Sequence, residues 1–228
     1  MEAIDGDTLR LDDGRELRLA GIEAPKTGPL AEQAKSALTK LIQGHSLSVR
    51  FGGAKSDRYG RMVGHGQRDD GRWLEGSLVE AGRVRVHTTP DNHALAAELL
   101  ALEGEARSAR RGLWTLRGYV VRDALDDLNR DLDSFQIVEG RVTTVSRRNI
   151  GAYLNFGADW RTDFTLFISK SVLHRLEKAG IDPAAWQDKR LRARGWLIKR
   201  NGPMIEINHP EQIEVLEPRQ GASPPDTP

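Results

Sequence analysis

Charged side chains stand at the turns of three short segments in the first quarter of the sequence. The segments are Asp5-Gly6-Asp7-Thr8, the stretch from Arg18 to Lys26, and Asp57-Arg58-Tyr59-Gly60-Arg61. Carboxylates suit a hard cation such as Ca²⁺, and guanidinium groups suit a phosphate because they donate two parallel hydrogen bonds. Each segment alone could be an ordinary turn or a solvated face. Together they predict a site that combines a metal ion with a phosphate ester.

Short strands and helices in residues 1–118 would position these segments. Leucines alternate with charged residues between positions 9 and 19 around an Asp-Asp-Gly turn, which predicts a β-hairpin. Helical spacing predicts one helix after Pro25, one over residues 73–81 and one from Asp91 to about Ala109. The last helix ends in Arg-Arg-Gly, a sequence typical of a helix C-terminus.

The order of these segments resembles that of the staphylococcal nuclease (thermonuclease) family. The matching pieces are the Asp-Gly-Asp-Thr turn, the Arg-Leu-Ala-Gly-Ile-Glu-Ala-Pro-Lys stretch, the Asp-Arg-Tyr-Gly-Arg loop and the closing residues 111–114, Arg-Gly-Leu-Trp. The resemblance covers about residues 3–114. It implies a five-stranded barrel of the OB type with three helices for the domain of residues 1–118.

The resemblance implies a calcium site. Asp7 and Glu23 fall at the positions of the two carboxylate ligands, the second of which is an Asp in the family. Ala24 falls where a backbone carbonyl contributes, so its apolar side chain does not matter there.

The resemblance also implies a phosphate site. Arg18 and Arg61 match the two arginines that grip the scissile phosphate and neutralise the charge of the transition state. Arg58 and Tyr59 fall where neighbouring groups contact a substrate phosphate. The stretch that begins at His87 lacks the tyrosines that stack on a base in the family, and His87 is interpreted as a surface histidine.

The sequence departs from the family at Lys26, where the family has the glutamate that activates water. An ammonium group near carboxylates stays protonated and has no acceptor for a proton. One interpretation is that the metal is lost or weakened and that Lys26 itself supplies positive charge to a phosphate-binding site. The other is that Ca²⁺ still binds and Glu32, or a metal-bound hydroxide alone, activates water slowly. We favour the first.

The remainder of the chain predicts a second OB-type barrel over residues 136–217, after a connecting helix or linker at 119–135 and before a disordered tail at 218–228. Its strand-rich pattern carries a helix at about 171–179. The predicted loops gather basic residues, with aromatic residues between them: Arg147, Arg148, Arg161, Lys199 and Arg200, with Tyr153, Phe156, Trp160 and Trp196. Such loops suit single-stranded nucleic acid. For Tyr153, Phe156 and Trp196, which alternate along strands, we favour a place in the core, and this leaves Trp160 as the better candidate for an exposed platform.

Composition limits the alternatives. The 228 residues are 38% apolar and 29% charged and contain no cysteine, which excludes disulfides, thiolate metal sites and a Cys nucleophile. No stretch approaches the ~18 apolar residues of a membrane helix. The formal net charge is +1, so nucleic-acid binding would depend on local clusters. Residues 1–5 do not resemble a signal peptide. The first strand is either shortened or begins upstream, so export and compartment stay open.

The sequence therefore predicts an α+β protein, mainly β, with two tandem five-stranded barrels of the OB type. It predicts that the protein binds single-stranded DNA or RNA through phosphodiester contacts of Arg18 and Arg61, with no membrane partner. Calcium-dependent hydrolysis would be weakened or absent because of Lys26. The alternatives are an active calcium-dependent nuclease that uses another base and a non-catalytic protein-interaction scaffold. Oligomeric state and the choice between endonuclease and exonuclease action stay open.

Overall fold

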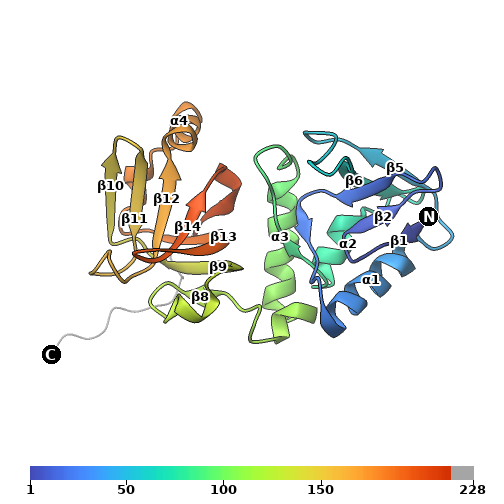
Figure 1. The fold of residues 1–228 in the computed structure, drawn as a ribbon, viewed down its shortest axis with the longest axis horizontal. Coiled ribbons are helices and arrows are strands. Elements are labelled where there is room, and N and C mark those ends of the chain that lie inside the picture. The colour runs from blue at the N-terminus through green and yellow to red at the C-terminus, as the bar shows by residue number, and fades with distance from the viewer. Residues whose placement is uncertain (217–228) are drawn as a thin grey trace. The chain divides into compact units, whose positions relative to one another are not determined.

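The computed structural model describes residues 1–216, which form two compact units divided after Val120 (Figure 1). Sheets carry most of the structure, and four α-helices lie in the described part. The mixed α+β class is therefore confirmed. The tail predicted to be disordered, residues 218–228, lies outside the described residues.

The first unit is built on a five-stranded sheet in the order β1-β2-β3-β6-β5. Its strands are β1 (Glu2–Ala3), β2 (Thr8–Arg10), β3 (Glu16–Leu19), β5 (Leu47–Arg50) and β6 (Met62–Arg68). The predicted hairpin is β2 and β3, with Leu9 opposite Leu17. Strand β3 pairs in parallel with β6. A separate two-stranded ladder joins β4 (Ile22–Glu23) to β7 (Arg85–Val86).

Three α-helices cover this unit, as predicted: α1 (Gly28–Ile42), α2 (Leu74–Glu80) and α3 (Ala96–Ser108). Their buried faces meet the inward leucines of β2 and β3 in one core, which includes Leu38 and Leu99. Helix α3 begins five residues later than expected. The reason is that Asn92 belongs to a turn, in which its N–H donates to Thr89 O and its side chain donates to Ala54 O.

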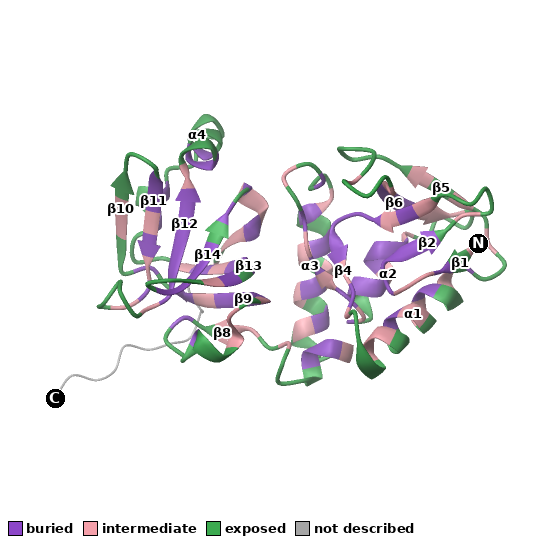
Figure 2. Ribbon diagram, viewed as in Figure 1, coloured by how far each residue is buried: buried purple, intermediate pink, exposed green. Residues whose placement is uncertain are grey.

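The second unit contains an eight-stranded sheet in the order β10-β11-β12-β14-β13-β9-β8, with β15 also paired to β13. The strands are β8 (Arg122–Asp123), β9 (Ser134–Arg141), β10 (Thr144–Arg148), β11 (Gly151–Asn155), β12 (Thr165–Ser169), β13 (Arg190–Arg200), β14 (Gly202–Ile207) and β15 (Ile213–Leu216). Helix α4 (Lys170–Lys178) follows β12, as expected, and its Val172, Leu173 and Leu176 enter the core. Figure 2 shows β12 buried along most of its length.

Two expectations differ from this structure. Residues 119–135, expected to be a connecting helix or linker, contain strand β8 and a 3₁₀ turn at Leu128–Asp131, and Ala124 and Leu128 are buried in the second core. The second sheet has eight strands rather than five: β8 comes from the segment expected to be a linker, and the first expected strand is divided into β9 and β10. In the described part of the first unit, β1 and β5 are the unpaired edges of their sheet. The structure therefore does not show two closed five-stranded barrels.

None of the helices within residues 1–216 combines the length and the apolar character needed to cross a bilayer.

Candidate functional site

The turn before β2 holds Asp7 at the centre of the first candidate site. The Asp7 side chain is fully buried, and its Oδ2 accepts a hydrogen bond of 2.5 Å from the N–H of Ala24. A Cβ at Gly6 would lie 2.5 Å from the Cβ of Ala34 on α1, so only glycine permits this close approach. The Asp7 carboxylate is therefore held at Oδ2 by a backbone N–H, and its Oδ1 accepts from the Thr8 hydroxyl at 3.2 Å.

The ammonium group of Lys26 lies directly on this carboxylate. Its Nζ donates to both oxygens of Asp7 at 2.9 Å, and it is 3.5 Å from an oxygen of Asp5 and 3.5 Å from an oxygen of Glu23. Burial would lower the pKa of Lys26, but the charge and hydrogen bonds of Asp7 and the charge of Glu23 outweigh it and raise that pKa above 10.5. The ammonium therefore stays charged at neutral pH and holds three carboxylates together.

Arg18 lies beside Lys26 and is held by several acceptors. It donates to the carbonyl oxygens of Leu19 at 2.7 Å and Ile22 at 2.8 Å and to Oε2 of Glu23 at 2.6 Å. Its Nε is also 3.4 Å from Oδ1 of Asp7. The protein itself therefore uses most of the donors that a phosphate would need.

Glu23 is the most strongly perturbed carboxylate of the cluster. Burial would raise its pKa, but the hydrogen bond from His87 and the charges of Arg18 and Lys26 lower it to about 2. Burial raises the pKa of Asp7, against the charges of Arg18 and Lys26. His87, interpreted from the sequence as a surface histidine, is 31% exposed, and its Nδ1 is 3.6 Å from Oε2 of Glu23. The β4–β7 ladder brings them together, and two-residue strands leave no readable pattern in the sequence.

The depressed pKa of Glu23 predicts a dependence of stability on pH. The ionised carboxylate stabilises the folded state above pH 4.5, and this contribution is lost as the pH falls toward about 2. We expect the free energy of unfolding to fall by about 1–3 kcal/mol more over this range in the unaltered protein than in a Glu23→Gln variant. Urea titrations at several pH values measure the difference. Equal slopes for the two proteins would show that Glu23 is not stabilised by its neighbours.

The loop at residues 57–61 places the second predicted arginine. Nε and NH2 of Arg61 are both 2.7 Å from Oδ2 of Asp57, which orders the loop. Tyr59 is 68% exposed, and the guanidinium carbons of Arg58 and Arg61 lie 4.8 and 5.5 Å from the centre of its ring. These three residues therefore form one exposed basic and aromatic surface.

Arg61 immediately precedes β6, which pairs in parallel with β3, the strand that carries Arg18. The two arginines therefore stand at neighbouring strands. Among residues 1–216, no hydrogen bond or ion pair joins the 57–61 loop directly to Asp7, Glu23 or Lys26.

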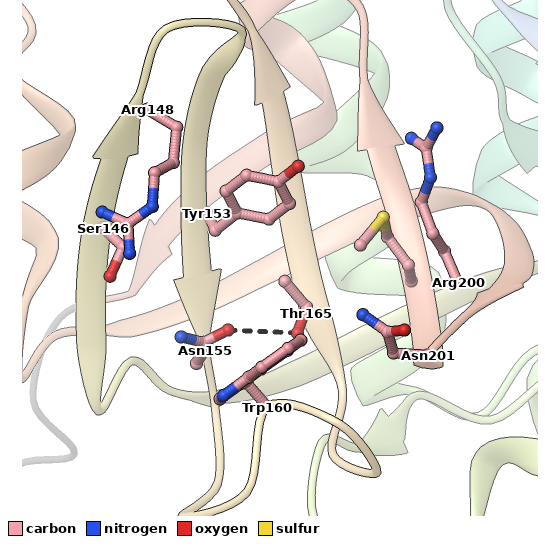
Figure 3. A pocket seen from close by; sticks show the side chains of 9 residues that line it. Ser146, Arg148, Tyr153, Asn155, Trp160, Thr165, Arg200 and Asn201 are labelled. Atoms are coloured by element: carbon pink, nitrogen blue, oxygen red, sulfur yellow. Dashed lines mark hydrogen bonds between the residues drawn. The ribbon is translucent and has the colours of Figure 1, made fainter.

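In the second unit, three of the residues predicted to bind nucleic acid meet around one pocket, together with Tyr153, which was expected in the core. Arg148 from β10, Tyr153 from β11, Trp160 from the following loop and Arg200 from the end of β13 line it (Figure 3). The sequence analysis missed the other lining residues, which are Ser146, Asn155, Thr165, Asn201 and Met204. The parallel pairing of β12 with β14 brings several of these together, and a local sequence pattern does not reveal it.

The other predicted residues lie outside this pocket lining. Arg147 forms ion pairs with Glu177 and Asp182, whereas Arg161 lies over the Trp160 ring with its guanidinium carbon 4.6 Å from the centre. Lys199 is exposed. Two aromatic residues also lie elsewhere. Phe156 is buried in the core, as expected, whereas Trp196, also expected in the core, is 58% exposed.

The first unit thus combines a small mixed sheet, three helices, an Asp-Gly-Asp turn against an arginine, and an Asp-Arg-Tyr-Gly-Arg loop at the neighbouring strand. This is the arrangement expected of a nuclease-like domain of the staphylococcal type.

Comparisons with known proteins agree. The sequence profile described as "Staphylococcal nuclease homologue" matches residues 16–116. A protein of Escherichia coli O157:H7 named "Uncharacterized endonuclease" is 31% identical over 119 residues, which are 50% of this chain and 74% of that protein. "Endonuclease YncB" of Bacillus subtilis is 28% identical over 52% of this chain and 62% of its own length. A rice protein, "Probable staphylococcal-like nuclease CAN1", is 38% identical over 43% of this chain.

This chain belongs to the staphylococcal nuclease homologue family. The alignment covers 28% of the rice protein and 62% of the Bacillus protein, so the chain spans less than two thirds of either.

Proposed function

We propose that the first unit binds nucleic-acid phosphodiesters through Arg18 and Arg61, and that calcium-dependent hydrolysis is weakened or lost because Lys26 occupies the position of the general base. The observation that carries this proposal is the contact of the Lys26 ammonium with both oxygens of Asp7, at 2.9 Å each. We further propose that the second unit is an OB-type module for single-stranded nucleic acid.

Proton transfer is the first reason. A general base needs a free lone pair near the working pH. Lys26 has none while protonated, and its carboxylate neighbours raise its pKa. Glu32, the substitute considered from the sequence, is exposed and forms no hydrogen bond or ion pair with any residue within 1–216. Glu32 therefore has no contact within residues 1–216 that would position it as a replacement for the missing carboxylate.

The metal site is the second reason. The carboxylates of Asp7 and Glu23 are ligands of the kind that Ca²⁺ takes. However, the Lys26 ammonium already contacts both Asp7 oxygens. A cation bound about 5 Å from that ammonium would meet a repulsion of about 3 kcal/mol per unit of metal charge at an effective dielectric of about 20. The residues therefore do not fit Ca²⁺ while Lys26 stays in place.

The two arginines differ in how readily a phosphate could reach them. The Arg18 side chain is 15% exposed and shares its donors with Glu23 and backbone carbonyls, whereas the Arg61 side chain is 29% exposed and has one carboxylate partner, Asp57. A phosphate would bind at Arg61 by sharing its guanidinium with Asp57, and Arg58 adds a second cation. We therefore expect Arg61 to contribute more to binding than Arg18.

Salt dependence tests this proposal. We expect short single strands of DNA or RNA, about 12 nucleotides long, to bind more weakly as the salt concentration rises. An Arg61→Gln variant should weaken binding and reduce the slope of log K against log [salt] by about 0.7, which is the loss of one phosphate contact. Fluorescence anisotropy with labelled strands measures both quantities.

Arg15→Gln is the matched control, because Arg15 also forms an exposed ion pair within a turn, with Asp13. It should leave the slope unchanged. Equal effects of the two substitutions would contradict a specific site at Arg61. If no strand binds even at low salt, the proposal fails and the protein-interaction scaffold is favoured.

An active calcium-dependent nuclease is the second candidate, because relatives from Escherichia coli and Bacillus subtilis carry the name endonuclease. Cleavage by the unaltered protein that requires calcium and stops with a chelator would establish this candidate.

A further inference from the structure

The pocket in the second unit lies on the face of the sheet that turns away from the hydrophobic core. Along β11, Ala152 and Leu154 point into the core, while Tyr153 and Asn155 alternate with them and line the pocket. The pocket has a volume of about 330 Å³. Figure 3 shows Tyr153 at its centre, between Arg148 on one side and Arg200 on the other, with Trp160 below.

Several polar groups in the pocket have no partner of their own. Within residues 1–216, the hydroxyl groups of Ser146 and Tyr153 and the side-chain amide of Asn201 form no hydrogen bond. The amide of Asn155 is held in a fixed orientation, because its Oδ1 accepts from Thr165 Oγ1 at 3.2 Å and its Nδ2 donates to Thr144 Oγ1 at 3.1 Å. A ligand with donors and acceptors on its edge could pair with these groups.

The charge of the pocket is positive. No Asp or Glu belongs to the pocket lining. Arg148 donates to the carbonyl of Arg147 and, in the part of the chain that the structure describes, has no carboxylate partner. Arg200 has one ion pair, with Glu206 at 2.9 Å, and both side chains are more than half exposed. Arg148 can therefore bind an anion without competition from a carboxylate. Arg200 can also bind one, because its exposed ion pair with Glu206 is weak.

Trp160 supplies a surface for stacking. It is 50% exposed, although indole is among the largest apolar groups, and the guanidinium of Arg161 lies over its ring at 4.6 Å. Tyr153 is held by Phe167, with the two ring centres 4.8 Å apart. A planar aromatic ligand can stack on Trp160 while its edge reaches the amides.

We propose that this pocket receives one base of a single-stranded nucleic acid, which stacks on Trp160 and pairs with the Asn155 and Asn201 amides, while Arg148 and Arg200 bind the flanking phosphates. Stacking platforms beside cations are the general means by which proteins hold single strands. This inference rests on the proposed nucleic-acid-binding function and adds the place where the strand is held by a base.

Tryptophan variants test the stacking step. We expect Trp160→Ala to weaken binding of a strand of about 12 thymines or uridines by about 10- to 100-fold, and Trp160→Phe to retain most of it. Trp196→Ala is the matched control, because Trp196 is equally large and exposed but does not line the pocket. A strand of abasic sugar phosphates should bind the unaltered protein and Trp160→Ala equally. The inference is overturned if Trp160→Ala and Trp196→Ala behave alike.

Two adjacent arginines test the charge step. Arg148→Gln should lower the slope of log K against log [salt] by about 0.7. Arg147→Gln removes the same charge, but from an arginine that is paired with Glu177 outside the pocket, so it should leave the slope unchanged. Thermal denaturation of each variant separates a lost contact from a loss of folding. Equal slopes for both variants would overturn the assignment of Arg148.

The outcomes distinguish this inference from the proposal for the first unit. If Arg61→Gln weakens binding while Trp160→Ala and Arg148→Gln do not, the pocket assignment fails and the phosphodiester site stands. If only the pocket variants weaken binding, the pocket stands and the first unit does not bind the strand. Binding of a free nucleoside monophosphate as tightly as the strand would overturn the inference in favour of a small-molecule site. The affinities of DNA and RNA strands of the same sequence, measured side by side, show which sugar is preferred.

Discussion

Replacement of Lys26 by glutamate is expected to increase calcium-dependent cleavage of nucleic acid by about 10²- to 10⁴-fold over the unaltered protein, the usual contribution of a general base. The Nζ atom of Lys26 lies 2.9 Å from both oxygens of Asp7. The substitution removes this ammonium and supplies a carboxylate that can accept a proton from water. Release of labelled fragments from single- and double-stranded DNA and RNA, with calcium and with chelator, measures the effect.

A Lys26→Gln variant separates the two changes that this substitution makes. It removes the repulsive charge but supplies no base, so we expect calcium binding by calorimetry to improve while cleavage stays low. Lys40→Glu is the control for a charge reversal on α1, because Lys40 lies in the last turn of that helix, away from the predicted ligands. Cleavage by the unaltered protein at the rate of Lys26→Glu would contradict the loss of the base.

The sequence was informative where chemistry is local. The Asp-Gly-Asp turn and the stretch from Arg18 to Lys26 are short segments in which the charged residues are close in sequence. The structure brings Asp7, Arg18, Glu23 and Lys26 into contact. The residue types did not reveal how far the charges in this cluster neutralise one another. The cations of Arg18 and Lys26 pair with the carboxylates of Asp5, Asp7 and Glu23. That depends on side-chain rotamers and on burial, which no spacing in the sequence reports.

The second site shows where sequence reasoning ends. The basic pair at 147 and 148 indicates two cations on one surface. However, successive side chains of a β-strand point to opposite faces, so Arg147 pairs with Glu177 and Asp182 while Arg148 lines the pocket. The polar residues of the pocket come from β10, β11, β12, the end of β13 and the β13–β14 turn. Their meeting depends on pairing between strands far apart in sequence, so it could not be deduced from the pattern of any one segment.

Strand β13 carries a feature that the sequence analysis overlooked. Arg190, Arg192 and Arg194 alternate along it and face glutamates on both neighbouring strands. Glu139 on β9 accepts from Arg190 and Arg192, and Glu214 on β15 accepts from Arg194 at 2.8 Å. Arg194 is 1% exposed, although arginine is rarely buried without a charged partner. This ladder therefore ties β15 to the sheet through a buried ion pair.

We expect Arg194→Ala to destabilise the second unit by about 2–4 kcal/mol, because it removes one of the two arginine partners of Glu214, leaving Arg192 at 3.4 Å, and opens a cavity in the sheet. Arg194→Met should cost less, since it keeps the apolar stem of the side chain. Urea unfolding followed by circular dichroism measures the loss. Arg10→Ala is the control, because Arg10 also pairs with glutamate from a strand but is 51% exposed, and its removal should cost less than about 1 kcal/mol.

The pair itself is isolated by combining Arg194→Met with Glu214→Gln. Because breaking a buried pair is costly mainly through the charge left behind, the double variant should be more stable than the sum of the two single changes predicts. A purely additive result would show that Arg194 stabilises the sheet through packing alone. A positive coupling would show instead that the charges on β13 and β15 hold β15 against the sheet. The proposed base pocket lies near the other end of β13, at Arg200.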